Sequence, residues 1–326
     1  MIYESLAILA GFILLIWSAE RFVTGAAAIA ANLNVSPLII GLTIVGFGTS
    51  APEMVVAMFA ALGGNPGLAI GNAIGSNIAN IALILGVTAL VIPLNVHSRI
   101  LKKELPLLLG AMVLMVLLLL DGHLSRLDGV LLFSSLIVLL WWITRQAMSE
   151  KQDAMEQEFE QELPDGIPLG KAVWLLIIGL IVLLGSSKLL VWGAVGIAQA
   201  LGVSDLIIGL TIIAIGTSLP ELAASIAAAL KKEHDLVVGN IVGSNIFNTL
   251  AVMGIPGMIW PAALPDGLLE RDVLVMFVLT FALFIMAFGF KKAGRINRVE
   301  AGLLCCGFIA YESWLYHIAV SGSGTL

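Results

Sequence analysis

Charged residues are scarce in this 326-residue sequence: Asp, Glu, Lys and Arg make up 12% of it. A soluble domain carries roughly 25% charged residues. Hydrophobic residues reach 60%, and they form runs near the ~20-residue length that crosses a bilayer. No basic patch extends beyond short loops, which argues against a nucleic-acid partner. The sequence therefore predicts a polytopic membrane protein with little room for a soluble domain.

Cysteine and histidine are also rare, with two and four residues. Cys305 and Cys306 are direct neighbours in an apolar run, an arrangement that seldom gives a disulfide or a metal framework. The histidines fall near the ends of the expected spans. We therefore expect no cofactor, no zinc, copper or iron site and no obligate protein partner. The first apolar segment lacks a basic n-region, so we expect a transmembrane helix there rather than a cleaved signal.

Hydropathy predicts an all-α fold of ten transmembrane helices. The expected spans are 3–31, 37–62, 66–93, 104–121, 125–145, 171–200, 205–230, 235–261, 270–290 and 297–318. The longest connection, 146–170, is rich in Glu and Gln and contains turn-forming Pro and Gly residues. We interpret it as an acidic cytoplasmic linker.

The two halves of the chain repeat one another. Residues 36–86 align without gaps onto 204–254, with about half of the positions identical. Five spans fall in 1–145 and five in 171–326. An odd number of spans makes the second half enter the membrane from the opposite side. The expected fold is thus two inverted five-helix repeats, the plan of many secondary transporters, whose sites lie near the membrane midplane.

Basic residues predict the orientation. Twelve fall in the loops on one side and two on the other. The positive-inside rule then places both termini on the periplasmic or extracellular side of an inner or plasma membrane. The twelve are Arg99, Lys102, Lys103, Arg145, Lys151, Lys171, Lys231, Lys232, Lys291, Lys292, Arg295 and Arg298; the two are Arg126 and Arg271.

Glu53 and Glu221 occupy matched positions inside the second and seventh spans. A charged residue at mid-bilayer costs on the order of 3 kcal/mol, and two ionised carboxylates facing one another would repel unless a cation lay between them. A neutral Gln would serve helix packing at lower cost. The pair therefore predicts a cation site.

Prolines next to these acids explain how neutral ligands arise. Pro52 and Pro220 lack an N–H, which frees carbonyl oxygens about one turn earlier. Helical spacing then places several oxygen-bearing positions on one face with each glutamate. They are Gly46, Thr49 and Ser50 with Glu53, and Ala214, Thr217 and Ser218 with Glu221.

A second polar stripe follows in the third and eighth spans. Its residues recur every four positions: Asn72, Ser76 and Asn80, then Asn240, Ser244 and Asn248. All of these groups offer oxygen, and Ca²⁺ takes six to eight oxygen ligands. For Asn72, Asn77, Asn240 and Asn245, hydrogen bonding between packed helices is an equally good interpretation.

The motifs resemble a known family. Gly48-Thr49-Ser50-Ala51-Pro52-Glu53 with Gly75-Ser76-Asn77-Ile78, repeated at 216–221 and 243–246, resembles the two α-repeats of sodium/calcium exchangers in the cation/Ca²⁺ antiporter superfamily. The chain is most similar to short prokaryotic members without a cytosolic regulatory domain. The resemblance implies an antiporter of Na⁺ and Ca²⁺, not an enzyme.

The resemblance also implies roles for individual residues. Ca²⁺ would bind Glu53 and Glu221 with carbonyl oxygens of Thr49 and Thr217. Na⁺ would use the same glutamates with Ser50, Ser218, Ser76, Ser244 and the carbonyls of Gly46 and Ala214. Asn80 and Asn248 would line the centre, and the first and sixth spans would slide to alternate access.

One departure from the family leaves alternatives open. Some members have Asp where this chain has Asn248, so the formal charge of the site is −2 from the two glutamates alone. Exchange of Ca²⁺ for H⁺ through the same glutamates remains an alternative. K⁺-dependent exchange is another alternative, although Glu at position 221 disfavours it. A cation channel agrees less well with a site formed by two repeats of one chain.

Overall fold

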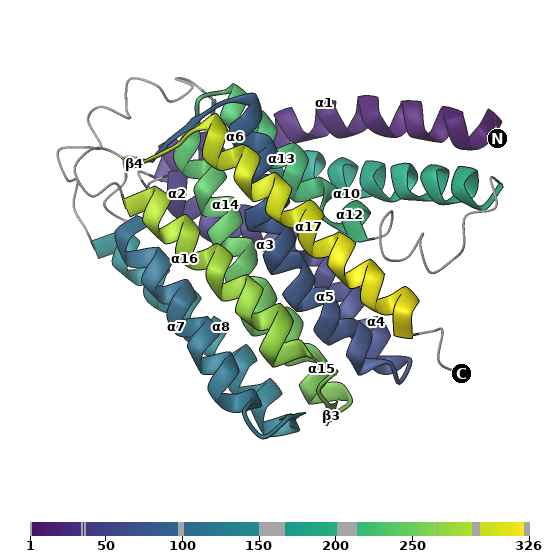
Figure 1. The fold of residues 1–326 in the computed structure, drawn as a ribbon. Helices are drawn as coiled ribbons and strands as arrows, with labels where there is room; N and C mark the ends of the chain where they lie inside the picture. Colours follow the sequence, from purple (N-terminus) through teal and green to yellow (C-terminus); the bar gives the residue numbers. More distant parts are fainter. Residues whose placement is uncertain are drawn as a thin grey trace.

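The computed structural model describes residues 2–33, 35, 37–96, 101–149, 167–200, 214–265, 267–288 and 294–322, and these are helical apart from two short β-ribbons (Figure 1). The first half contains α1 (Ile2–Leu33), α2 (Pro37–Ile40), η1 (Gly41–Val45), α3 (Gly46–Thr49), α4 (Ala51–Leu62), α5 (Pro66–Ala79), η2 (Asn80–Leu85), α6 (Gly86–Val91), β1 (Leu94–Val96), α7 (Leu101–Leu119), β2 (His123–Leu124) and α8 (Arg126–Ser149). The second half contains α10 (Leu169–Ala200), α12 (Ala214–Thr217), α13 (Leu219–Leu230), α14 (His234–Phe247), η4 (Asn248–Val252), α15 (Met253–Ile259), β3 (Ala262–Ala263), η5 (Leu268–Val273), α16 (Leu274–Phe288), β4 (Gly294–Ile296) and α17 (Arg298–Gly322).

The expected all-α membrane fold is confirmed. Among the described residues, five helices are long and apolar enough to cross a bilayer unaided, and a bent pair makes six. Among the other expected spans, Glu104–Leu119 and Leu219–Leu230 are shorter apolar helices, and the tenth is the continuous helix Arg298–Gly322. The start of the expected seventh span and most of the expected linker lie outside the described residues.

Three central spans are interrupted by π-helical turns, labelled η. The second span runs through η1 and then bends by 48° between Gly41–Thr49 and Ala51–Leu62. The third and eighth spans switch from α to π at η2 and η4 and return to α in α6 and α15. Turns of this kind are rare and are frequently found at functional sites.

Two β-ribbons join the halves on opposite sides of the membrane. β1, after the third span, pairs antiparallel with β4, before the tenth, so that Asn95 faces Arg295. β2, between the fourth and fifth spans, pairs with β3, which follows the eighth. The first ribbon joins loops that follow an odd number of crossings, and the second joins loops that follow an even number. The pairing therefore fits ten alternating crossings.

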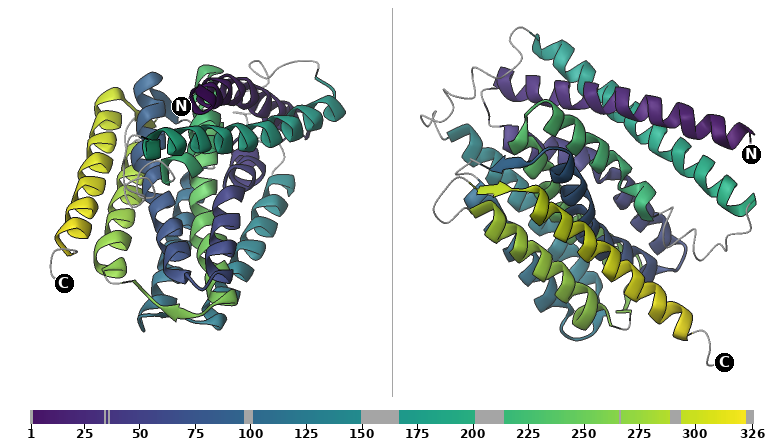
Figure 2. Two further views of the ribbon diagram at one scale, coloured as in Figure 1. Left: turned by 90° about the vertical axis from the view of Figure 1, so that its right-hand side faces the viewer. Right: turned by 45° about the horizontal axis from the view of Figure 1, so that its top comes forward.

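The helices form a bundle with one attached pair. α1 and α10 lie side by side and extend away from the other helices (Figures 1 and 2). Their backbones are so close that a Cβ on Gly25 would lie 2.5 Å from the Leu176 nitrogen. The eighth span, by contrast, is enclosed by other helices: the 18-residue window that identifies it is entirely buried. The polar residues of α14 therefore face protein rather than lipid.

Candidate functional site

The two Pro-Glu motifs break their spans at matched positions. Ser50 (φ −81°, ψ 1°) separates α3 from α4, and Ser218 (φ −90°, ψ 4°) separates α12 from α13. Each following helix has its proline in the first turn, where a missing N–H is tolerated. The acid follows directly, so each glutamate starts a helix in the interior of the bundle. Glu53 is 1% exposed and Glu221 is 2% exposed.

An asparagine from the next span holds the backbone of each glutamate. The side-chain amide of Asn72 donates to the carbonyl oxygen of Glu53 at 3.4 Å. The amide of Asn240 donates to the carbonyl of Glu221 at 3.5 Å and to the Ser225 hydroxyl at 3.0 Å. Asn72 and Asn240 therefore fit both interpretations. Each amide joins two packed helices, and the same hydrogen bond holds the backbone of a site glutamate in position.

Thr49 connects the two halves. Its hydroxyl donates to Oδ1 of Asn240 at 3.1 Å and lies 3.3 Å from the Ser244 hydroxyl. Asn240 also donates to the carbonyl of Glu221. Thr49 of the first-half motif is thus linked through Asn240 to the backbone of the second-half acid. The close approach of these spans needs Gly243, where a Cβ would lie 2.5 Å from the Leu42 carbonyl oxygen.

The third and eighth spans meet through a chain of amides. Asn80 donates to Oδ1 of Asn245 at 2.9 Å, and Asn77 donates to the hydroxyl of Thr249 at 3.0 Å. Asn245 donates to the carbonyl of Asn77 at 3.5 Å. Both π-helical turns begin at residues predicted for the site, Asn80 and Asn248. The change of helical pitch thus falls at matched positions of the two repeats.

Several buried oxygens in this region have no hydrogen-bond partner within the described part of the chain. They include Ser50 Oγ, Glu53 Oε2, Glu221 Oε2 and Asn248 Oδ1. Buried polar atoms are normally paired, so unpaired ones need an explanation such as an ion or water. All four belong to residues that the sequence predicted for the site. The donor set is therefore suited to a hard cation.

The remaining predicted residues are placed as follows. Ser76, Ser218 and Ser244 are buried, and Thr217 is half-buried. The carbonyl oxygen of Gly46 already accepts a hydrogen bond from the Ser50 amide at 3.0 Å. Ala214 is the first residue of α12. No group of three or more His, Cys, Asp or Glu that could hold a metal occurs in the described ranges, so hydroxyl, amide and backbone oxygens are the neighbours available to the two carboxylates.

Sequence reasoning missed several supporting residues. Ser187 in α10 donates to the carbonyl of Gly216 at 2.8 Å, which lacks its usual helical donor because residue 220 is proline. The matched position in the first half is Ala19, so the repeat could not reveal this bond. Ser225 and Thr249 likewise have no polar counterpart at Ala57 and Ile81.

Comparison with known proteins identifies the class. The family model described as sodium/calcium exchanger protein matches residues 4–145 and 171–316. "Putative antiporter CaxA" of Alkalimonas amylolytica is 48% identical over 97% of this chain and 99% of its own. Inner membrane protein YrbG of Escherichia coli K12 is 40% identical over 98% of each. The chain belongs to the sodium/calcium exchanger family.

A solved structure shares the fold. The sodium-calcium exchanger NCX_Mj, soaked with 2.5 mM Na⁺ and 10 mM Sr²⁺, superposes with a TM-score of 0.82 at 34% identity, covering 95% of this chain and 97% of that one. The protein is therefore an integral, multi-pass membrane transporter of the cation/Ca²⁺ exchanger class and not an enzyme.

Proposed function

We propose that this protein exchanges Na⁺ for Ca²⁺ across the membrane, with both ions competing for one site between the repeats. The unpaired oxygens of Ser50, Glu53, Glu221 and Asn248 are the observation that carries the proposal, because they are buried together with two acids. The solved relative was soaked with Na⁺ and Sr²⁺, which supports this pair of ion classes.

The proposed ligands are those that the resemblance to sodium/calcium exchangers implies. Glu53 and Glu221 bind Ca²⁺ with the carbonyl oxygens of Thr49 and Thr217. Na⁺ binds at overlapping positions on the same two acids, and Asn80 and Asn248 line the centre. The remaining Na⁺ ligands are Ser50, Ser218, Ser76, Ser244 and the carbonyls of Gly46 and Ala214.

Charge explains why the ions compete. Two carboxylates give the site a formal charge of −2, which one Ca²⁺ or two Na⁺ neutralise. An empty or half-filled site leaves charge in a low-dielectric interior, where it is unfavourable. Only the compensated site then changes easily between its two facing states, and coupling follows from the different affinity of each ion for each state.

The decisive experiment measures ⁴⁵Ca²⁺ uptake by proteoliposomes with an outward Na⁺ gradient. Breaking a buried charged site costs about 3 kcal/mol or more, so Glu53→Gln and Glu221→Gln should each lower uptake at limiting Ca²⁺ about 100-fold. Glu312→Gln is the matched control, because Glu312 is a half-buried acid in α17 outside the site. Full exchange in either site variant would refute the assignment.

The same vesicles separate the rival functions. Uptake that requires a pH gradient and does not change with the Na⁺ gradient would indicate Ca²⁺/H⁺ exchange. Uptake that requires K⁺ together with Na⁺ would indicate K⁺-dependent exchange. Flux far above carrier turnover would indicate a channel.

We also propose that both termini lie on the periplasmic or extracellular side. The excess of basic residues in the loops that include β1 and β4 supports this orientation. We further propose that 1–145 and 171–326 act as the two five-helix units, with motifs 36–86 and 204–254, joined by the acidic linker 146–170.

A further inference from the structure

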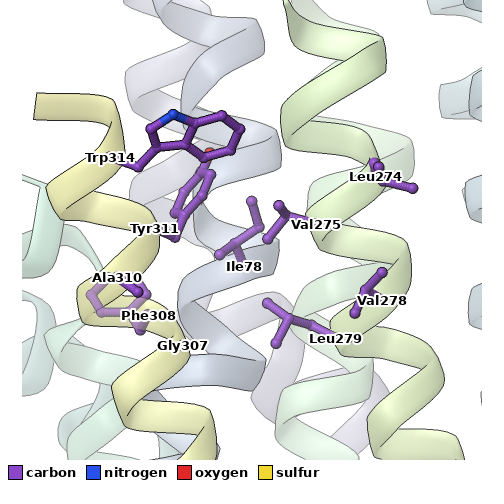
Figure 3. A pocket seen from close by; sticks show the side chains of 10 residues that line it. All are labelled: Ile78, Leu274, Val275, Val278, Leu279, Gly307, Phe308, Ala310, Tyr311 and Trp314. Atoms are coloured by element: carbon purple, nitrogen blue, oxygen red, sulfur yellow. The ribbon is translucent and has the colours of Figure 1, made fainter. Parts of the chain in front are cut away.

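A groove on the outside of the bundle lies behind the candidate site. It has a volume of about 400 Å³ and is lined by residues of α5, α16 and α17. Trp314 and Leu274 stand at one end of it, Gly307 and Leu279 at the other, and Ile78 lies between the two walls (Figure 3). The lining residues are apolar except for Tyr311, and the Tyr311 hydroxyl donates to Asp272 at 2.9 Å.

The groove crosses the middle of the bundle. It follows α17 from Gly307 to Trp314, a distance of about 10 Å at 1.5 Å per residue. Gly307 lies three residues before the midpoint of α17 (Arg298–Gly322), and Trp314 lies four residues after it, toward the β2–β3 side. The groove thus reaches slightly past the bilayer centre at Gly307, and its Trp314 end points toward the β2–β3 side.

An ion pair lies near the Trp314 and Leu274 end of the groove, next to Tyr311. Arg271 pairs through Nε and Nη2 with Asp272, at 2.6 and 2.9 Å, and Asp272 also accepts from Tyr311. This pairing leaves Nη1 outside the bidentate contact, and the side chain of Arg271 is 23% exposed. Arginine binds phosphate well through such donors, and aromatic residues such as Trp314 favour the membrane interface.

We propose that this groove holds one acyl chain of a glycerophospholipid from the leaflet on the β2–β3 side, with its phosphate next to Arg271. The apolar walls fit the chain, the distance from Arg271 to just past the bilayer centre fits its length, and the Nη1 donors of Arg271 fit the phosphate oxygens. The bound acyl chain would also pack against residues that adjoin Asn77 of the candidate site. Ile78 follows Asn77, and Val275 precedes Met276, whose sulfur lies 3.3 Å from the Asn77 amide.

Glycine in α17 provides a direct test. A Cβ on Gly307 would meet no described atom within 4 Å, so the backbone accepts a side chain there, and Gly307→Leu places one at a position that lines the groove. Gly302 lies in the same helix, is equally unobstructed and does not line the groove. Gly302→Leu is therefore the matched control. Val278→Phe narrows the groove from the opposite wall at a residue that is 60% exposed, and provides a second variant should Gly307→Leu fold poorly.

Native mass spectrometry of the purified full-length chain should detect one retained phospholipid in the wild type and in Gly302→Leu. Gly307→Leu and Val278→Phe should lose it. Adding phosphatidylglycerol to delipidated protein should raise the melting temperature of the wild type and not of Gly307→Leu. Equal lipid retention in all four proteins would overturn the proposal. So would a wild-type dimer that Gly307→Leu converts to monomer, because a second copy would then occupy the groove. None of these measurements depends on which ion is transported.

Discussion

Thr49→Val tests whether the contact between the halves shapes the ion site. A hydroxyl carries one proton, so if Thr49 donates to Asn240, the contact with Ser244 requires Ser244 to donate to Thr49. Valine keeps the branched shape and removes both interactions. Hydrogen bonds between membrane helices average about 0.6 kcal/mol, which is the loss expected for the contact with Ser244.

The partner left behind adds to this loss. Oδ1 of Asn240 would lose the Thr49 donor while 99% of the residue stays buried, since Asn240 is 1% exposed. An unsatisfied buried acceptor costs about 1–3 kcal/mol. We therefore expect Thr49→Val to lower the free energy of unfolding by about 2–4 kcal/mol. Because Asn240, the partner of Thr49, also donates to the carbonyl of Glu221, the half-saturating Ca²⁺ concentration should rise about tenfold, which corresponds to about 1.4 kcal/mol.

The assays are unfolding in detergent, followed by tryptophan fluorescence, and Ca²⁺-dependent exchange in vesicles. Thr280→Val is the matched control. Thr280 is equally buried, but its hydroxyl bonds within its own helix, to the carbonyl of Met276 at 2.8 Å. The control should leave the half-saturating Ca²⁺ concentration within twofold of the wild type. Equal effects of the two substitutions on both stability and Ca²⁺ dependence would refute the reasoning.

Two further predictions concern the pairing of spans and the orientation. Ser187→Ala should lower the free energy of unfolding by about 1–3 kcal/mol, because it leaves the Gly216 carbonyl without its side-chain donor. The control is Ser186→Ala, which should lower it by less, because the Ser186 hydroxyl bonds within its own helix. Equal losses in the two variants would contradict the role of Ser187. In a background without Cys305 and Cys306, an impermeant maleimide should label His123→Cys in intact cells and Lys231→Cys only after permeabilisation, whereas the reverse pattern would place the termini inside.

Much of the fold follows from the sequence because hydropathy and the repeat act over long stretches. The expected spans 3–31, 66–93 and 235–261 compare with Ile2–Leu33, Pro66–Val91 and His234–Ile259. The broken second span was also predictable, because Pro52 forbids a regular helix. These features depend on the composition of a window or on one residue with a fixed effect.

Other features depend on partners distant in sequence. A π-helical turn at Asn80 or Asn248 adds one residue to a turn and leaves the apolar pattern almost unchanged, so hydropathy does not reveal it. β1 and β4 have three residues each, and they form strands only by pairing with one another across about 200 positions, so the local sequence does not predict them. The candidate residues were predicted together, whereas the contacts of Ser187, Ser225 and Thr249 were not, because the first half has Ala19, Ala57 and Ile81 in their places.

The burial of the eighth span has a consequence for how the chain is made. Its helix has the lowest hydropathy of the five candidate spans, 1.5, and its window is entirely enclosed. During synthesis it reaches the bilayer after seven earlier spans, and its Asn240, Ser244 and Asn245 find their partners in Thr49, Asn77 and Asn80 of the first half. The polar groups of the eighth span therefore complete these hydrogen bonds only when the first half is present. Separated halves would each expose polar helices to lipid, whereas co-expressed halves supply one another's hydrogen bonds.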